Sequence, residues 1–138
     1  MERCIKRNRN SLHCRKAHKM VNVIYIEDEE TEALLFQIGL APRGINVLHI
    51  PDAQPESLIV LETPEYQRAR VLFFDLWISG VSGIDLARSL RDQGDERPFF
   101  LVTAAENPNP ALLRQLRLGF LQKPLDFAQV ADLILSAA

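Results

Sequence analysis

The chain has 138 residues, about one typical domain, with 47% hydrophobic residues, 25% charged residues and a net charge of −2. No apolar run approaches the roughly 18 residues of a membrane span, and the two cysteines do not suggest a disulfide framework. These values exclude a membrane protein, a secreted mini-protein, a repeat solenoid and a two-domain enzyme. We expect a cytoplasmic protein.

Charge divides the chain into two pieces. Residues 1–20 carry a net charge of +6, and residues 21–138 carry −8. The first piece has few aliphatic side chains and no periodicity, so we expect a disordered basic extension, or a natural start at Met20. Two alternatives remain for it: an arm for an anionic surface, and a metal site, although the spacing matches no zinc motif. The metal-type side chains are Cys4, His13, Cys14 and His18.

From residue 21 onward, short apolar runs alternate with helix-length amphipathic stretches. The predicted strands are Val21–Ile26, Ile45–Ile50, Val71–Phe74, Phe99–Val102 and Gly119–Leu121. The predicted helices are 30–40, 55–63, 83–92, 110–118 and 126–136. Alternation of this kind predicts an α/β domain, a doubly wound, five-stranded parallel sheet with helices on both faces.

Polar residues follow four of these strands directly. Glu27 and Asp28 come after the first strand and Asp75 after the third, while Thr103 and Lys123 follow the fourth and fifth. Ligands of open α/β sheets bind at the carboxyl ends of the strands, where the strand order reverses. With the strand order 2-1-3-4-5, the three carboxylates would converge and the other two side chains would flank them.

Clustered carboxylates repel one another unless a cation lies among them. Oxygen ligands without nearby His or Cys favour Mg²⁺, with Mn²⁺ as the alternative. A lysine in the same place indicates that an anion also enters. Metal, carboxylate nucleophile, lysine and hydroxyl are together what phosphoryl transfer to an aspartate requires.

Residues 21–138 resemble the receiver domain of two-component response regulators. The segment IEDEE is similar to the family's acidic cluster, and DLWISGVSG is similar to its phosphoacceptor loop. The strand that ends in Thr103-Ala104 and the segment FLQKP complete the match. Four motifs in the right order at the ends of the right strands make the resemblance specific, although each motif alone is weak.

The resemblance implies a role for each matching residue. Asp75 would be phosphorylated, Asp28 would bind Mg²⁺ directly, and Glu27 would act through a metal-bound water. The resemblance gives four further roles. One residue would bind the metal through its backbone carbonyl, two would bind the phosphoryl group through their side chains, and an aromatic residue would change rotamer as one of these two, a threonine, moves. These fall on Trp77 (carbonyl), Thr103 and Lys123 (phosphoryl binding) and Phe120 (switch).

The chain departs from the family pattern in three places. Ser79 and Ser82 replace the usual Pro and Asp after the phosphoacceptor, and the Gly-Ala pair common before the fifth strand is missing. The final helix, DFAQVADLILSAA, has no basic residue for the charged pairing through which many receivers dimerise. We expect no output domain after this one and an output that comes from a partner.

The sequence therefore predicts a stand-alone phosphoacceptor module that receives a phosphoryl group from a histidine kinase or a histidine phosphotransfer protein. It would catalyse its own phosphorylation and dephosphorylation without turning over a separate substrate, and would signal by docking to a downstream protein. One alternative is a receiver-like docking module that phosphorylation does not switch. Nucleic-acid binding through residues 1–19 is a third hypothesis that we do not favour, and homodimer formation stays open.

Overall fold

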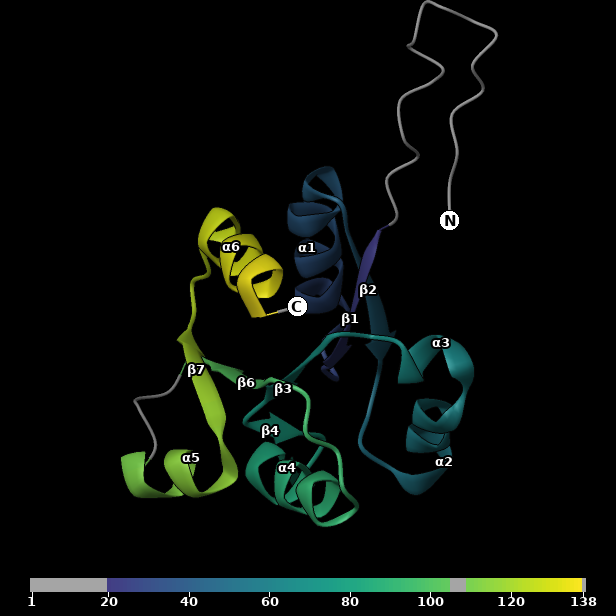
Figure 1. The fold of residues 1–138 in the computed structure, drawn as a ribbon, viewed down its shortest axis with the longest axis vertical. Helices are drawn as coiled ribbons and strands as arrows, with labels where there is room; N and C mark the ends of the chain where they lie inside the picture. The colour runs from purple at the N-terminus through teal and green to yellow at the C-terminus, as the bar shows by residue number, and fades with distance from the viewer. Residues whose placement is uncertain (1–19, 105–108, 138) are drawn as a thin grey trace, which may run out of the picture.

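The computed structural model describes residues 20–104 and 109–137. Its sheet has five parallel strands in the order β2-β1-β3-β6-β7 (Figure 1). The strands are β1 (Val21–Ile26), β2 (Ile45–Ile50), β3 (Val71–Asp75), β6 (Phe99–Thr103) and β7 (Leu118–Gln122). The predicted order 2-1-3-4-5 and the predicted fold class are confirmed.

Helices cover both faces of the sheet. One face packs against α1 (Glu30–Leu40) and α6 (Phe127–Ala137), and the aromatic side chains of Phe36 and Phe73 lie in that layer. The other face packs against α4 (Gly83–Asp92) and α5 (Pro110–Leu116), together with three short helical segments. Because the connections between the strands make all five parallel, their carboxyl ends lie at the same edge of the sheet.

The region 55–63, predicted as a single helix, is instead broken into short pieces. It contains α2 (Pro55–Leu58) and the 3₁₀ turn η2 (Ile59–Glu62), and it is followed by α3 (Pro64–Gln67). Thr63 is extended, with φ −79° and ψ 155°. A residue before proline disfavours the helical region, so Pro64 ends one helical segment and begins the next.

The fourth predicted helix, 110–118, is also too long. α5 ends at Leu116, because Arg117 adopts a left-handed conformation with φ 56°. Leu118 already pairs with Phe99 in the sheet. A short 3₁₀ turn, η1 (Ala41–Arg43), follows α1.

A two-stranded hairpin between β3 and α4 was not predicted. β4 (Trp77–Ile78) and β5 (Val81–Ser82) pair antiparallel around Ser79 and Gly80, which both have positive φ. Positive φ at both central positions is the geometry of a tight two-residue hairpin. The Ser82 hydroxyl accepts hydrogen bonds from the amides of Ile84 and Asp85, and so caps α4.

Two other helices begin at residues that are typical of helix starts. Asp126 accepts a hydrogen bond of 2.9 Å from the Ala128 amide at the start of α6, and Pro110 occupies the first turn of α5. No helix in residues 20–104 and 109–137 is long and apolar enough to cross a membrane. The predictions for residues 1–19, including Cys4, His13, Cys14 and His18, lie outside the described residues.

Candidate functional site

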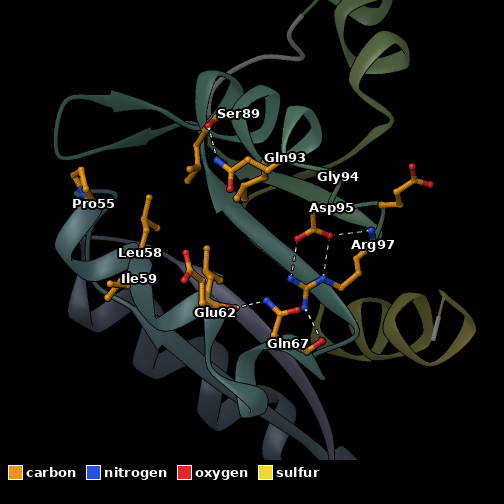
Figure 2. A pocket seen from close by; sticks show the side chains of 14 residues that line it. Pro55, Leu58, Ile59, Glu62, Gln67, Ser89, Gln93, Gly94, Asp95 and Arg97 are labelled. Atoms are coloured by element: carbon orange, nitrogen blue, oxygen red, sulfur yellow. Dashed lines mark hydrogen bonds and ion pairs between the residues drawn. The ribbon is translucent and has the colours of Figure 1, made fainter.

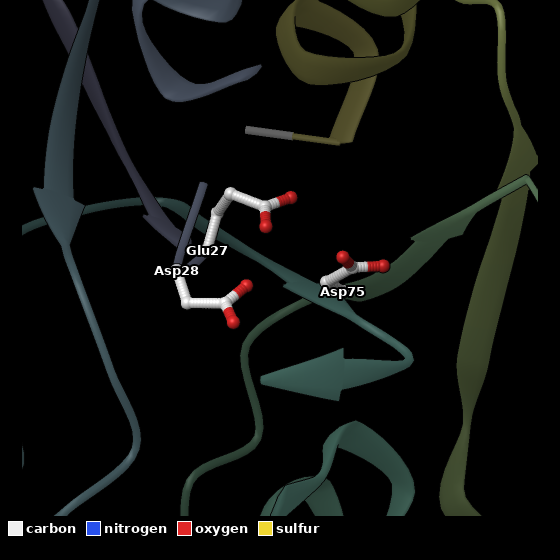
Figure 3. Close-up of side chains that lie close together, drawn as sticks. All are labelled: Glu27, Asp28 and Asp75. Atoms are coloured by element: carbon white, nitrogen blue, oxygen red, sulfur yellow. The ribbon is translucent and has the colours of Figure 1, made fainter. Parts of the chain in front are cut away.

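Three carboxylates meet at the carboxyl ends of β1 and β3. Each of Glu27, Asp28 and Asp75 offers one oxygen, and these oxygens all lie within 4.8 Å of one another. Figure 3 shows the side chains of Glu27 and Asp28 extending toward Asp75. Adjacent parallel strands bring these residues together, because β1 and β3 are neighbours in the sheet.

The three acids differ in burial. Glu27 is fully buried, Asp75 is half-buried and Asp28 is exposed. Burial, opposed by a hydrogen bond from the Glu29 amide and reinforced by the charge of Asp75, raises the pKa of Glu27 to about 7. For Asp28, burial acts in the same direction, but Glu27 and the hydrogen bonds from Ser79 outweigh it and hold its pKa below the usual range.

Lys123 is the cation of the site. Its ammonium Nζ lies 3.1 Å from Glu32 Oε1, 3.6 Å from Glu27 Oε1 and 3.9 Å from Asp75 Oδ2. Burial favours the neutral amine, but the hydrogen bond that the ammonium donates to Glu32 and the charges of Asp75, Glu27 and Glu32 raise the pKa of Lys123. One lysine therefore serves three acids and stays charged.

Asp75 is oriented by the backbone. The Leu76 amide donates to its Oδ1 at 2.8 Å, and this leaves Oδ2 as the oxygen nearer to Lys123. Gly83 is required close by, since a Cβ on it would lie 2.0 Å from the Asp75 carbonyl oxygen. The start of α4 is thereby held directly against the end of β3.

Thr103, Trp77 and Phe120 stand in different surroundings. Thr103 is buried at the end of β6, next to β3, and its carbonyl accepts a hydrogen bond of 2.9 Å from the Lys123 amide. The side chain of Trp77 is 61% exposed on the hairpin. Phe120 is half-buried and packs against the apolar core on the α4 and α5 face.

Three residues contact the site although the sequence analysis did not predict them as site residues. The Tyr25 hydroxyl donates to Glu27 Oε1 at 3.0 Å, Glu32 holds Lys123, and both the amide and the hydroxyl of Ser79 donate to Asp28 Oδ2. Tyr25 could have been found, because residues two apart on a strand share a face. The other two contacts join elements far apart in the sequence and leave no local signal.

The set of donors fits a hard divalent cation. Magnesium is bound through carboxylate and other oxygen ligands, and a space bounded by three carboxylate oxygens with a single lysine has an excess of negative charge. Mn²⁺ has the same preference for oxygen. The carboxylates of Glu27, Asp28 and Asp75 could therefore hold such an ion.

Two of the cavities in the described part of the chain bear on where a ligand would bind. One, of about 410 Å³, lies beside the site and is lined by residues that include Lys123, Glu32 and Tyr25. The other, of about 770 Å³, lies between α2, η2 and α4 and contains none of the predicted site residues (Figure 2). Its wall includes an ion pair between Asp95 and Arg97.

Comparison with curated proteins shows sequence similarity to a response regulator. The chain is 30% identical over 87 residues to the two-component response regulator PhoP of Pseudomonas aeruginosa. The match covers 63% of this chain and 37% of that protein, so the chain corresponds to only part of its length. No protein-family model matches the chain.

Comparison with solved structures identifies the fold. A CheY-like receiver domain from Methylobacillus flagellatus superposes with a TM-score of 0.73 at 22% identity, covering 87% of this chain and all of that domain. The Francisella response regulator 1452 receiver domain gives 0.73 at 19% identity, over 85% of this chain and 95% of that one. Vibrio cholerae chemotaxis protein CheY4 gives 0.72 at 18% identity, over 86% and 99%. The predicted resemblance is confirmed.

Proposed function

We propose that this chain, which has the fold of response regulator receiver domains, accepts a phosphoryl group on Asp75. The observation that carries the proposal is the convergence of Glu27, Asp28, Asp75 and Lys123 at the carboxyl edge of a receiver-type sheet. The donor would be a histidine kinase or a histidine phosphotransfer protein, and the proposal keeps the cytoplasmic location expected from the sequence.

Asp75 Oδ2 is the proposed nucleophile, because the Leu76 amide already binds Oδ1. As Oδ2 bonds to phosphorus, the bond from phosphorus to the donor's nitrogen or oxygen breaks, and its electron pair leaves with the donor. The Asp75 carboxylate must be ionised for this attack.

The carboxylates would hold a divalent cation. Asp28 and Asp75 are the proposed direct ligands together with the backbone carbonyl of Trp77, and Glu27 acts through a bound water. When bound, Mg²⁺ supplies positive charge that offsets the repulsion between the carboxylates and the incoming phosphoryl oxygens.

Lys123 and Thr103 are the proposed phosphoryl ligands. The ammonium lies 3.9 Å from Asp75 Oδ2, so a short movement carries it to an oxygen of the transferred group. Fixed positive charge aimed at a transferring phosphoryl group stabilises the transition state. Thr103 would donate its hydroxyl, and Phe120 would change rotamer with it and alter the surface offered to a downstream protein.

The test is intact-mass spectrometry of the wild type and of Asp75→Asn after incubation with Mg²⁺ and acetyl phosphate. We expect one added phosphoryl group on the wild type alone, and none when a chelator removes Mg²⁺ first. An adduct of equal size on Asp75→Asn would place the acceptor elsewhere. A wild type that neither acetyl phosphate nor a histidine phosphodonor modifies would favour the alternative, a docking module that phosphorylation does not switch.

A further inference from the structure

The hydroxyl of Tyr25 is a buried polar group beside the site to which the proposed mechanism assigns no task. Tyr25 is 1% exposed and Glu27 is fully buried. The hydroxyl donates to Glu27 Oε1 at 3.0 Å, while the Glu29 amide donates to Oε2 at 3.1 Å. A buried carboxylate needs such donors, because water cannot reach it.

The tyrosine ring is held firmly in place. Its centroid lies 4.3 Å from that of Phe36 and 6.5 Å from that of Phe73, which meets it edge-on. Tyr25 and Glu27 are two residues apart on the same strand and its direct extension, so their side chains share one face. Packing therefore fixes the hydroxyl at a position from which it reaches Glu27.

Glu27 Oε1 has a second neighbour, the Lys123 ammonium at 3.6 Å. That ammonium is shared with Glu32 at 3.1 Å and with Asp75 at 3.9 Å. Asp75, the proposed acceptor, is thus the farthest of its three partners. Any closer pairing of Lys123 with Glu27 takes the ammonium away from the side of the site where the phosphoryl group would arrive.

We infer that Tyr25 is a positioning residue for Lys123, and the inference rests on the proposed phosphoryl transfer to Asp75. Its neutral hydroxyl supplies a donor to Glu27 Oε1 that does not come from the lysine. The buried carboxylate is then satisfied without a tight ion pair. Lys123 stays between Glu27 and Asp75, where it can turn to a phosphoryl oxygen.

The variant that isolates this effect is Tyr25→Phe, which removes one oxygen and keeps the ring. Tyr66→Phe is the matched control, since Tyr66 is the only other tyrosine of the chain and lies on α3. With saturating Mg²⁺ and acetyl phosphate, we expect Tyr25→Phe to be phosphorylated about tenfold more slowly, as for other losses of an outer-shell hydrogen bond. Tyr66→Phe should match the wild type.

A background variant tests whether Tyr25 acts through Glu27. Glu27→Asp shortens the side chain by one methylene, so its carboxylate no longer reaches the hydroxyl. In that background Tyr25→Phe should cause no further loss of rate. A full tenfold loss there would overturn the inference, and so would an unchanged rate of Tyr25→Phe in the wild-type background when the wild type is phosphorylated.

Crystal structures of the wild type and of Tyr25→Phe supply a readout that does not depend on phosphorylation. We expect Nζ of Lys123 to lie closer to Glu27 and farther from Asp75 in the variant. If the wild type takes no phosphoryl group, the proposed function fails and these distances alone decide the positioning role. Unchanged distances from Nζ to both carboxylates would overturn the positioning role. A purely structural role of Tyr25 would lower the thermal stability of the variant and leave these distances unchanged.

Discussion

The two edges of the sheet differ in how their charged side chains are paired. At the amino edge, Arg91 donates four hydrogen bonds to backbone carbonyls at the end of α5 and in the segments before β6 and β7, and its guanidinium lies 3.7 Å from the centroid of Phe99. Arg97 binds both carboxylate oxygens of Asp95 and reaches the carbonyls of Tyr66 and Ala69 before β3. Both arginines therefore use their hydrogen bonds to hold neighbouring segments of the chain together.

At the carboxyl edge, negative charge is left in excess. Glu27, Asp28 and Asp75 share a small space, and Lys123 is divided between two of them and Glu32. Charges that are fully paired stabilise a fold, whereas unbalanced like charges cost stability and are retained where a ligand balances them. The charges at the amino edge are therefore paired within the fold, whereas the carboxyl edge holds the candidate functional site.

The largest effect that we expect is on the rate of phosphorylation when the lysine at the carboxyl edge is removed. Lys123→Met should lower the rate of Asp75 phosphorylation by acetyl phosphate by about 100-fold, as for the loss of other electrostatic groups that stabilise a transition state. Intact-mass spectrometry over time measures the rate. The melting temperature with Mg²⁺ present is the control, and a folded variant with the wild-type rate would contradict the role of Lys123.

At the amino edge the expected effect is on stability. Arg97→Met should lower the free energy of unfolding by about 2 kcal/mol, because it removes hydrogen bonds between charged groups and leaves carbonyls unpaired. The control is Arg88→Met, whose exposed pair with Asp85 at 3.1 Å should be worth less than about 0.5 kcal/mol. Urea unfolding measures both, and equal losses for the two variants would be the contradicting result.

The Arg97 variant also carries a pH signature. Burial favours the protonated form of Asp95, but the hydrogen bonds and charge of Arg97 outweigh it and lower the pKa of Asp95. A lowered carboxyl pKa adds stability at neutral pH that is lost as the pH falls below about 4. The difference in the free energy of unfolding between the wild type and Arg97→Met should therefore become smaller in acid.

The smallest expected effect concerns Trp77, whose side chain is 61% exposed on the hairpin beside the site. We predict that its indole slows the entry of hydrolytic water, so Trp77→Asn should shorten the half-life of phosphorylated protein several-fold. Its free energy of unfolding should stay near that of the wild type, because little apolar surface is lost from the core. An unchanged half-life would contradict this prediction.

Local pattern was enough to predict the main elements. Val21–Ile26, Ile45–Ile50 and the helices Glu30–Leu40 and Gly83–Asp92 begin and end where the apolar periodicity indicated. Buried parallel strands have continuous apolar runs, and helices have period 3.6, so both signals are strong in a single sequence. In the region 55–63, Pro64 accounts for the end of the helical structure at Glu62, because Thr63 before it is extended, but it does not account for the change to a 3₁₀ turn at Ile59.

The sequence by itself determined the order of strands and helices, and it placed an acid, a hydroxyl or a lysine directly after four strands. These two features can be predicted from the sequence because each depends only on residues that are close together in the chain. Only the tertiary structure decided that Ser79 binds Asp28, that Glu32 competes for Lys123 and that Tyr25 holds Glu27. The first two contacts join distant segments and depend on packing and register, which no local pattern encodes. The spacing of Tyr25 and Glu27 predicts that their side chains share a face, but it does not predict the hydrogen bond between them.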